Sequence, residues 1–122
     1  MTDKVDIHWL SEPEEQDYPA AKSYLSLLYD EAKAGRYADQ LQQAPLSKFK
    51  AKDIFRASGL SLLGTSNAHV EKDRQKILAG NKLSPLLLVR DTGVRVLIAD
   101  GYHRLCAVYA FSEDALIPCK IV

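Results

Sequence analysis

The run Pro85-Leu86-Leu87-Leu88-Val89 constrains the fold most, because five apolar residues follow one another without a polar break. A strand buried on one face alternates apolar and polar residues, whereas an unbroken apolar run is typical of a strand covered on both faces. The rest of the chain must therefore supply packing layers on both sides of the sheet that contains residues 85–89.

The residues after this run predict a hairpin, a buried helix and a closing strand. Asp91-Thr92-Gly93 is turn chemistry, so residues 94–99 should form the second strand of a hairpin. Asp100-Gly101 ends that strand and opens a helix over 102–111, which is apolar nearly all round and therefore buried. Residues 117–122 close the chain as a strand.

The signals before residue 50 are weaker. Residues 5–10 alternate apolar and polar, which predicts a first strand, and residues 11–17 form an acidic loop. Pro19 is well placed in a first helical turn. In one interpretation this helix ends at Gly35; in the other, Tyr37 and Leu41 extend it towards Pro45.

The middle of the chain predicts two helices. Residues 51–57 read as a short helix that Ser58-Gly59 stops. A second helix, capped by Ser66 or Asn67, runs to about residue 79, with Val70, Ile77 and Leu78 facing inward. We therefore expect one α+β domain over residues 1–122, in which helices pack on a small mixed β-sheet.

The charge balance argues against strong binding to nucleic acid or to an anionic membrane. Sixteen basic and sixteen acidic side chains cancel, so the chain has no overall field. The two parts differ, since residues 1–46 hold nine acids and four bases, and residues 47–122 hold seven acids and twelve bases. A phosphate or polyanion should therefore bind the second part.

The sequence predicts a cytoplasmic protein without a membrane segment. Residues 1–10 lack a basic start followed by a long apolar run, so they do not resemble a signal peptide. No apolar run approaches the ~20 residues of a membrane-spanning helix. Cys106 and Cys119 match no metal-binding spacing, and we expect two buried, reduced thiols.

The turn Asp100-Gly101-Tyr102-His103-Arg104 is the candidate anion site. The first N–H groups of a helix are unpaired and carry partial positive charge, so they attract phosphate. Gly101 leaves room for a close approach, and His103 and Arg104 add donors in the first turn. The alternative is purely structural: Asp100 caps the helix and pairs with Arg104, while His103 lies on the surface.

Three segments of the chain together resemble the ParB/sulfiredoxin-like superfamily. They are residues 85–90, the stretch Val96-Leu-Ile-Ala-Asp-Gly-Tyr-His-Arg-Leu-Cys-Ala, and the closing Ile117-Pro-Cys-Lys-Ile-Val. The resemblance is strongest over residues 66–122. It implies that the turn, with Gly101, Tyr102, His103 and Arg104, binds the phosphates of an ATP- or CTP-type nucleotide.

Two differences from the superfamily pattern limit the functions that the resemblance implies. Tyr102 stands where sulfiredoxins carry their catalytic cysteine, which argues against sulfinic-acid reduction. No helix-turn-helix domain follows the turn, which argues against DNA as a partner. The motif is most similar to the branch that includes a free-serine kinase, so the resemblance implies phosphoryl transfer or nucleotide hydrolysis, with Asp100 and His103 as candidate catalytic residues.

That branch also uses an upstream carboxylate. The acidic residues of the loop are candidates for it or for Mg²⁺, although a solvated charge run is the alternative interpretation. They are Glu12, Glu14, Glu15 and Asp17.

Two further groups could complete a phosphate site. His69, Lys72 and Lys76 are spaced i, i+3 and i+7, so they share one helix face. The superfamily contacts nucleotide from the corresponding helix; the alternative is a solvated face.

The second group lies in the short helix. Arg56 and Ser58 could close over phosphate while Asp53 serves as a base or a Mg²⁺ ligand. The alternative is a surface ion pair between Asp53 and Arg56, with Ser58 ending the helix.

Two functions follow. The first is a nucleotide-binding protein that uses ATP or CTP, with Mg²⁺, for hydrolysis or transfer to a small substrate. The second is a module without catalysis that binds a protein partner, a second copy of the chain or nucleic acid. Its basic patch would be Lys48, Lys50, Lys52 and Arg56.

Overall fold

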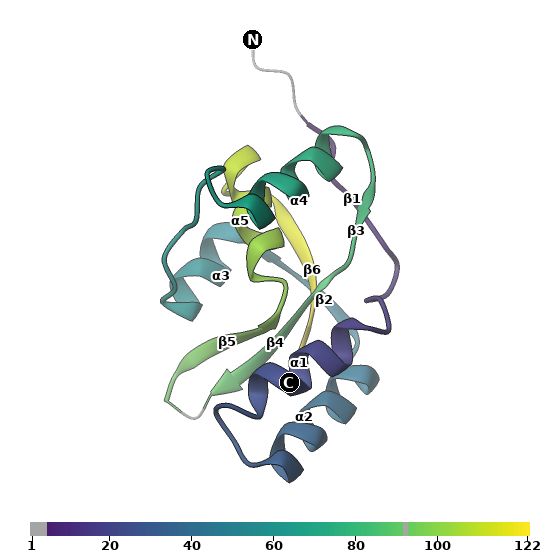
Figure 1. The fold of residues 1–122 in the computed structure, drawn as a ribbon, viewed down its shortest axis with the longest axis vertical. Coiled ribbons are helices and arrows are strands. Elements are labelled where there is room, and N and C mark those ends of the chain that lie inside the picture. The colour runs from purple at the N-terminus through teal and green to yellow at the C-terminus, as the bar shows by residue number, and fades with distance from the viewer. Residues whose placement is uncertain (1–4, 92) are drawn as a thin grey trace.

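A computed structural model describes residues 5–91 and 93–122 of the chain. Its helices are α1 (Asp17–Leu25), α2 (Glu31–Gln43), α3 (Ala51–Ser58), α4 (Ala68–Leu78) and α5 (Tyr102–Phe111). Its strands are β1 (His8–Trp9), β2 (Leu46–Lys50), β3 (Lys82–Leu83), β4 (Leu86–Asp91), β5 (Arg95–Asp100) and β6 (Leu116–Ile121). Figure 1 shows β1 and β3 side by side, away from the larger sheet.

The larger sheet has the order β2-β6-β4-β5 and is mixed. β6 runs antiparallel to β2 and parallel to β4, and β4 and β5 form the antiparallel hairpin that the sequence predicts. The expected α+β class with a small mixed sheet is confirmed. Thr92, at the centre of the expected hairpin turn, lies outside the described residues, as do residues 1–4.

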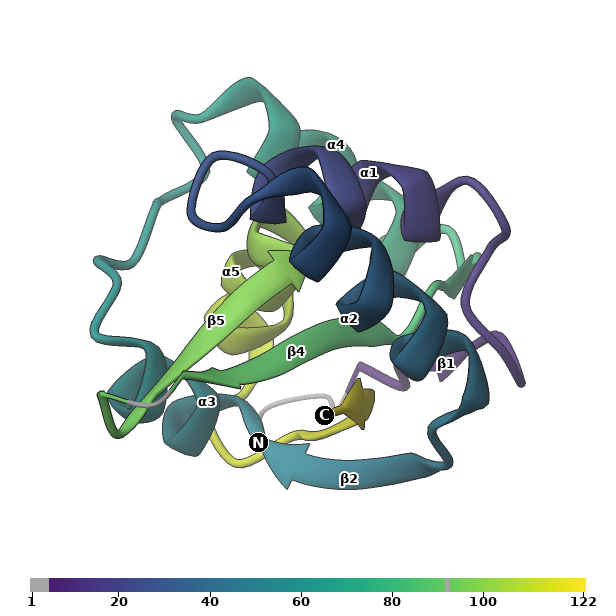
Figure 2. The same cartoon turned by 90° about the horizontal axis from the view of Figure 1, so that it is seen from below.

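Both faces of this sheet are covered, as the apolar run of β4 requires. Leu86 and Leu88 belong to a core with α3, α4 and α5, whereas Leu87 and Val89 belong to a second core with α1 and α2. Figure 2 shows β4 and β5 lying between these two groups of helices. Successive strand residues point to opposite faces, so an unbroken leucine run feeds both cores.

Local signals predicted the second part of the chain well. Asn67 caps α4 by accepting hydrogen bonds from two backbone N–H groups, and Gly59 ends α3 in the left-handed conformation. α5 and β6 lie where the sequence places them. Two features differ: the Leu78 side chain is exposed instead of facing inward, and the short strand β3 was not predicted.

The chain up to Lys50 differs from the prediction in three places. The expected strand over residues 5–10 shortens to β1, and β2 was not predicted at all. The single helix from Pro19 is two helices, because Asp30 caps a new one by accepting a hydrogen bond from the Lys33 N–H at 2.7 Å. Gly35 therefore ends no helix and lies inside α2.

Cys106 and Cys119 are free and buried, as predicted. Burial raises the pKa of the Cys119 thiol to about 12, so this sulfur stays protonated and unreactive. Among the described residues, no helix has both the length and the apolar character needed to cross a membrane.

Candidate functional site

Gly101 allows the chain to pass from β5 into α5. It is the residue before the first turn of α5 and has φ = +108°, a conformation that side-chain-bearing residues rarely adopt. A Cβ atom there would lie 2.8 Å from Leu86 Cγ and 2.9 Å from Arg104 Nη2. The position therefore excludes any side chain, because Leu86 and Arg104 already fill the space that a Cβ atom would need.

A pocket of about 200 Å³ lies between α4 and the start of α5, and we call it the α4–α5 pocket. It gathers most of the residues that the sequence singled out for phosphate. Its lining is His69, Lys72, Asp73, Lys76, Asp100, Gly101, Tyr102, His103 and Arg104. The predicted stripe on α4 thus faces the predicted turn, although the two are some thirty residues apart in the sequence.

The two histidines meet across this pocket. The ring centroids of His69 and His103 are 4.9 Å apart with an interplanar angle of 42°. The Tyr102 ring also lies near His103, with ring centroids 5.5 Å apart. His103 therefore belongs to the pocket wall and contacts α4, in contrast to the alternative that leaves it on the surface.

The cations of the α4–α5 pocket are only partly neutralised. Lys76 Nζ lies 3.9 Å from Asp73 Oδ1. Lys72 lines the same pocket, and it forms no ion pair with any residue in the described part of the chain. Lys72 is therefore the side chain most available to an anion.

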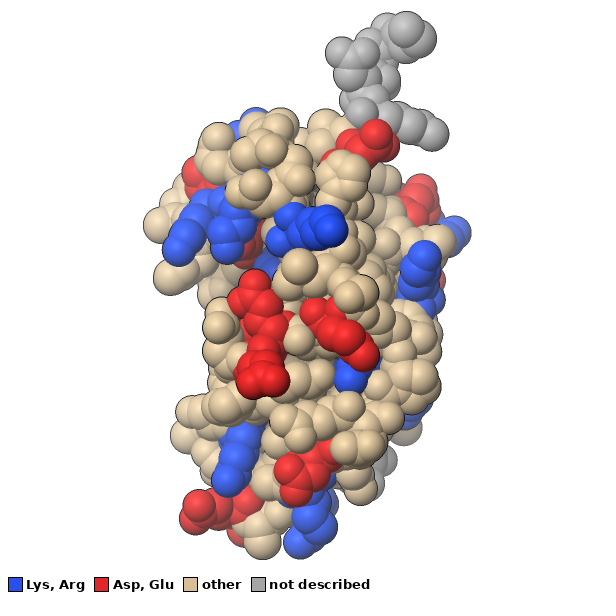
Figure 3. Space-filling view, turned by 90° about the vertical axis from the view of Figure 1, so that its right-hand side faces the viewer, with Lys and Arg blue, Asp and Glu red and all other residues tan. Residues whose placement is uncertain are grey.

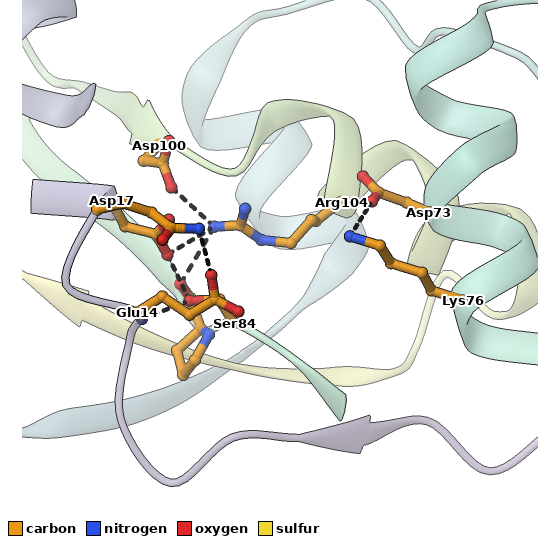
Figure 4. A network of polar contacts seen from close by, with 9 residues as sticks. Glu14, Asp17, Asp73, Lys76, Ser84, Asp100 and Arg104 are labelled. Atoms are coloured by element: carbon orange, nitrogen blue, oxygen red, sulfur yellow. Dashed lines mark hydrogen bonds and ion pairs between the residues drawn. The ribbon is translucent and has the colours of Figure 1, made fainter. Parts of the chain in front are cut away.

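The guanidinium group of Arg104 lies in a partly buried polar network (Figure 4). Its Nη2 lies 2.9 Å from Asp100 Oδ2 and 3.6 Å from Asp17 Oδ2, and donates to the Pro85 carbonyl at 3.4 Å. Its Nε is buried without a hydrogen-bond partner in the described residues. Arg104 thus fixes the turn to α1 and to the segment before β4.

Asp17 also belongs to this network, although the sequence did not distinguish it from the other acidic residues of its loop. Its carboxylate accepts a hydrogen bond from the Ser84 hydroxyl, which in turn accepts one from the Glu14 N–H at 3.1 Å. Asp17 is buried, while Glu12, Glu14 and Glu15 are exposed. The solvated-loop interpretation therefore holds for the three glutamates and fails for Asp17.

The structural alternative for Asp100 is confirmed for the ion pair with Arg104 and wrong for the helix cap. Asp100 pairs with Arg104, but no side chain caps α5. Burial raises the pKa of Asp100; the Arg104 guanidinium opposes this shift, and the neighbouring Asp17 carboxylate adds to it. Two acids therefore share one arginine at the base of the pocket.

The second predicted group, which consists of Asp53, Arg56 and Ser58, does not lie at the α4–α5 pocket. Asp53 Oδ1 and Arg56 Nη1 lie 3.6 Å apart on exposed side chains of α3. Ser58 is buried, and its hydroxyl donates to the Phe55 carbonyl at 3.0 Å and accepts from the Leu60 N–H at 3.2 Å. None of the three lines the α4–α5 pocket.

No metal cluster accompanies Asp53. The part of the chain that the structure describes contains no group of three or more His, Cys, Asp or Glu side chains placed to hold a metal ion. Asp53 instead has Arg56 as its partner, which does not suit a lone Mg²⁺ ligand.

The basic patch is also largely engaged. Lys50 and Lys52 both approach Asp114, at 3.9 and 2.7 Å, and Arg56 pairs with Asp53. On the face that Figure 3 presents, acidic groups lie beside basic ones, and neither sign covers that face. Three of the four cations in the patch therefore already have an acidic partner.

Comparison with known proteins adds no relative: no family model, no curated protein and no solved structure matches the chain. Membership of the ParB/sulfiredoxin-like superfamily therefore stays a prediction from the residues quoted above. What the site can bind has to be inferred from its own geometry.

Proposed function

We propose that the protein binds the phosphates of an ATP- or CTP-type nucleotide in the α4–α5 pocket. The observation that carries the proposal is that Lys72, which has no ion-pair partner in the described residues, lines the same pocket as the start of α5, where no side chain caps the helix. A helix N-terminus and a nearby ammonium group are the two features with which proteins most often hold phosphate.

The charge of the lining supports the same ligand. Lys76 approaches Asp73, and Arg104 is shared by Asp100 and Asp17, so Lys72 is the cation of the lining without an acidic partner in the described residues. No side chain of the described residues caps α5, so no side-chain acceptor among them occupies the N–H groups of its first turn.

Arg104 has a different part in this proposal from Lys72. Its Nη2 is occupied by Asp100, Asp17 and the Pro85 carbonyl, so it mainly holds the turn in place. The proposal therefore assigns direct phosphate contacts to Lys72, Lys76, the histidines and the backbone of α5.

Catalysis is the second part of the proposal. Asp100 and His103 line the pocket, so hydrolysis of the nucleotide or phosphoryl transfer to a small substrate would use these two residues. Mg²⁺ commonly takes one or two protein carboxylates together with phosphate oxygens. Asp73 and Asp100 are the carboxylates that could contact a Mg²⁺ ion brought in by the nucleotide.

Calorimetric titration with ATP, CTP and ADP, with and without Mg²⁺, tests the binding. We expect Lys72→Ala to weaken the best of these ligands by on the order of tenfold or more, because a charge-assisted contact is lost. Lys48→Ala, which removes an equally exposed lysine from β2, should leave the affinity unchanged. No binding of any of the three at millimolar concentration would rule out the proposal.

Phosphate release from the tightest nucleotide tests the catalytic part separately. Asp100→Asn should abolish any release while the nucleotide still binds, whereas His103→Gln should abolish release and also weaken binding, because His103 contributes to the phosphate contacts. If the parent protein binds nucleotide without releasing phosphate, the binding proposal is supported and the catalytic proposal is contradicted.

The alternative function, a module that binds a protein partner or nucleic acid, has less support from geometry, because three of the four cations in its patch are paired. Steeply salt-dependent binding of DNA or RNA, with no effect of nucleotide, would select this alternative.

A further inference from the structure

The α4–α5 pocket is too small for a whole nucleotide. Sites for small molecules usually enclose roughly 300–1,000 Å³ and bury most of their ligand. About 200 Å³ accommodates a chain of phosphates but not the sugar and base as well. If the proposed function is correct, the rest of the ligand must lie against another part of the surface.

A second pocket, of about 380 Å³, adjoins the first, and we call it the α1–α5 pocket. Both pockets are lined by the turn from Asp100 to His103. The walls that the second pocket does not share come from Ala20 and Tyr24 of α1, Leu60, and Ile98 and Ala99 of β5. One turn thus separates a cationic pocket from a pocket with mainly apolar walls.

The walls of the α1–α5 pocket suit a flat apolar ring. Ile98 and Ala99 form a buried apolar floor, whereas Tyr24 and Leu60 are 40% and 44% exposed although they are large apolar side chains. Exposed apolar side chains that gather around one hollow mark a binding surface more often than isolated ones do. A tyrosine face also stacks readily on a heteroaromatic ring.

Tyr102 ties the apolar wall to the turn. Its ring lines both pockets, and its hydroxyl donates a hydrogen bond to the Ser61 carbonyl, next to Leu60. Burial, with Cys106 nearby, raises the pKa of Tyr102, so the hydroxyl keeps the proton that it donates. The position of Leu60 is therefore coupled to the same turn that lies beside the phosphate pocket.

We infer that one amphipathic ligand occupies both pockets, with phosphates in the α4–α5 pocket and an aromatic ring in the α1–α5 pocket against Tyr24 and Leu60. This inference rests on the proposed function. It makes the protein selective for phosphates carried on a heteroaromatic nucleoside and against inorganic pyrophosphate or polyphosphate. Together the two pockets reach the size of an ordinary small-molecule site.

The test compares pyrophosphate with ADP and CDP on the same protein by calorimetry. We expect the better nucleoside diphosphate to bind on the order of tenfold tighter than pyrophosphate, because stacking adds to the phosphate contacts. Leu60→Asp should remove that advantage and leave pyrophosphate binding unchanged. Leu62→Asp, an equally exposed leucine two residues away that does not line the pocket, is the matched control.

Backbone amide NMR of the parent protein locates the ring. Addition of ADP or CDP should shift the signals of Tyr24, Leu60 and Ile98 together with those of His69 and Lys72, whereas pyrophosphate should shift only the latter two.

The outcomes separate the two proposals. Equal affinity for pyrophosphate and both nucleotides, or no effect of Leu60→Asp on nucleotide affinity, overturns the inference and leaves phosphate binding intact. If neither pyrophosphate nor a nucleotide binds, the proposed function fails and the inference fails with it.

Discussion

The chain contains two Asp–Arg pairs that look equivalent in the sequence and differ completely in the structure. Asp53 and Arg56 are three residues apart in α3; Asp100 and Arg104 are four apart at the start of α5. The side chains of the first pair are 53% and 82% exposed, and those of the second only 19% and 18%. The nitrogen–oxygen distances are 3.6 and 2.9 Å.

The difference lies in what else each arginine contacts. Arg104 has two carboxylates and a backbone carbonyl around one nitrogen, from three separate parts of the chain, whereas Arg56 has Asp53 alone. An exposed pair gains little in water, but a buried charge that loses its partner is strongly destabilising. Helical spacing therefore predicts an ion pair in both places, but it does not predict how much each pair stabilises the fold.

Replacement of each arginine should separate the pairs most clearly. Arg104→Met leaves two buried acids without their cation, so we expect the free energy of unfolding to fall by about 3–5 kcal/mol. Arg56→Met should change it by less than about 0.5 kcal/mol. Urea denaturation of both variants measures the difference, and similar losses would show that the two pairs are equivalent after all.

The glycines beside the two pairs give the next largest effect. Gly101→Ala brings a Cβ atom against Leu86 in the core and strains a positive φ, so we expect a loss of about 2–4 kcal/mol. Gly59→Ala has a similar strain but meets only the flexible Arg95 side chain at 3.4 Å, so about 1 kcal/mol is expected. Thermal unfolding should rank them in this order; the reverse order would contradict the packing argument.

Ser84 tests whether the buried network extends beyond the ion pair. Ser84→Ala removes the donor to Asp17 and the acceptor of the Glu14 N–H, and we expect a loss of about 1–3 kcal/mol. Ser26→Ala, which removes an exposed hydroxyl bonded to the Ser23 carbonyl, is the control and should lose less than about 0.5 kcal/mol. Equal losses would confine the network to Asp100 and Arg104.

The pH dependence of stability gives the smallest effect. The pKa of Asp100 is raised by burial, so the folded protein binds its proton more tightly than the unfolded chain does. The contribution of Asp100 is therefore present at low pH and is lost as the pH rises from about 4 through its raised pKa. Relative to Asp100→Asn, the parent should lose stability over this range.

Unfolding curves of parent and variant at several pH values measure this drift. Asp53→Asn removes the same charge from the exposed pair and serves as the control. A parent that gains stability relative to Asp100→Asn as the pH rises would show that Arg104 outweighs burial.

The sequence predicted the elements whose signals are local. The apolar run of β4, the caps at Asn67 and Gly59 and the turn at Gly101 each lie within a few residues of the element that they define. β2 was missed because its alternating lysines look like a basic surface segment, and its strand character comes from pairing with β6. Such pairing is a tertiary effect, which local propensity does not contain.

The residues of the candidate site also divide into those with a local signal in the sequence and those placed only by tertiary packing. The stripe on α4 and the turn before α5 were predicted because helical spacing and the resemblance are both visible in sequence. The part played by Asp17 was not, since it depends on where α1 packs against the segment before β4. A buried acid in an acidic run gives no local signal, and only the fold distinguishes it from its exposed neighbours.

The central place of β6 in the sheet has a consequence for the time course of folding. β6 lies between β2 and β4, so Leu46 pairs with Lys120 and Leu86 with Cys119. Contacts between residues so distant in the chain require large loops to close before they stabilise anything, and this slows folding. The helices can form early, but the sheet that supports the turn at Gly101 is complete only after its last strand is inserted.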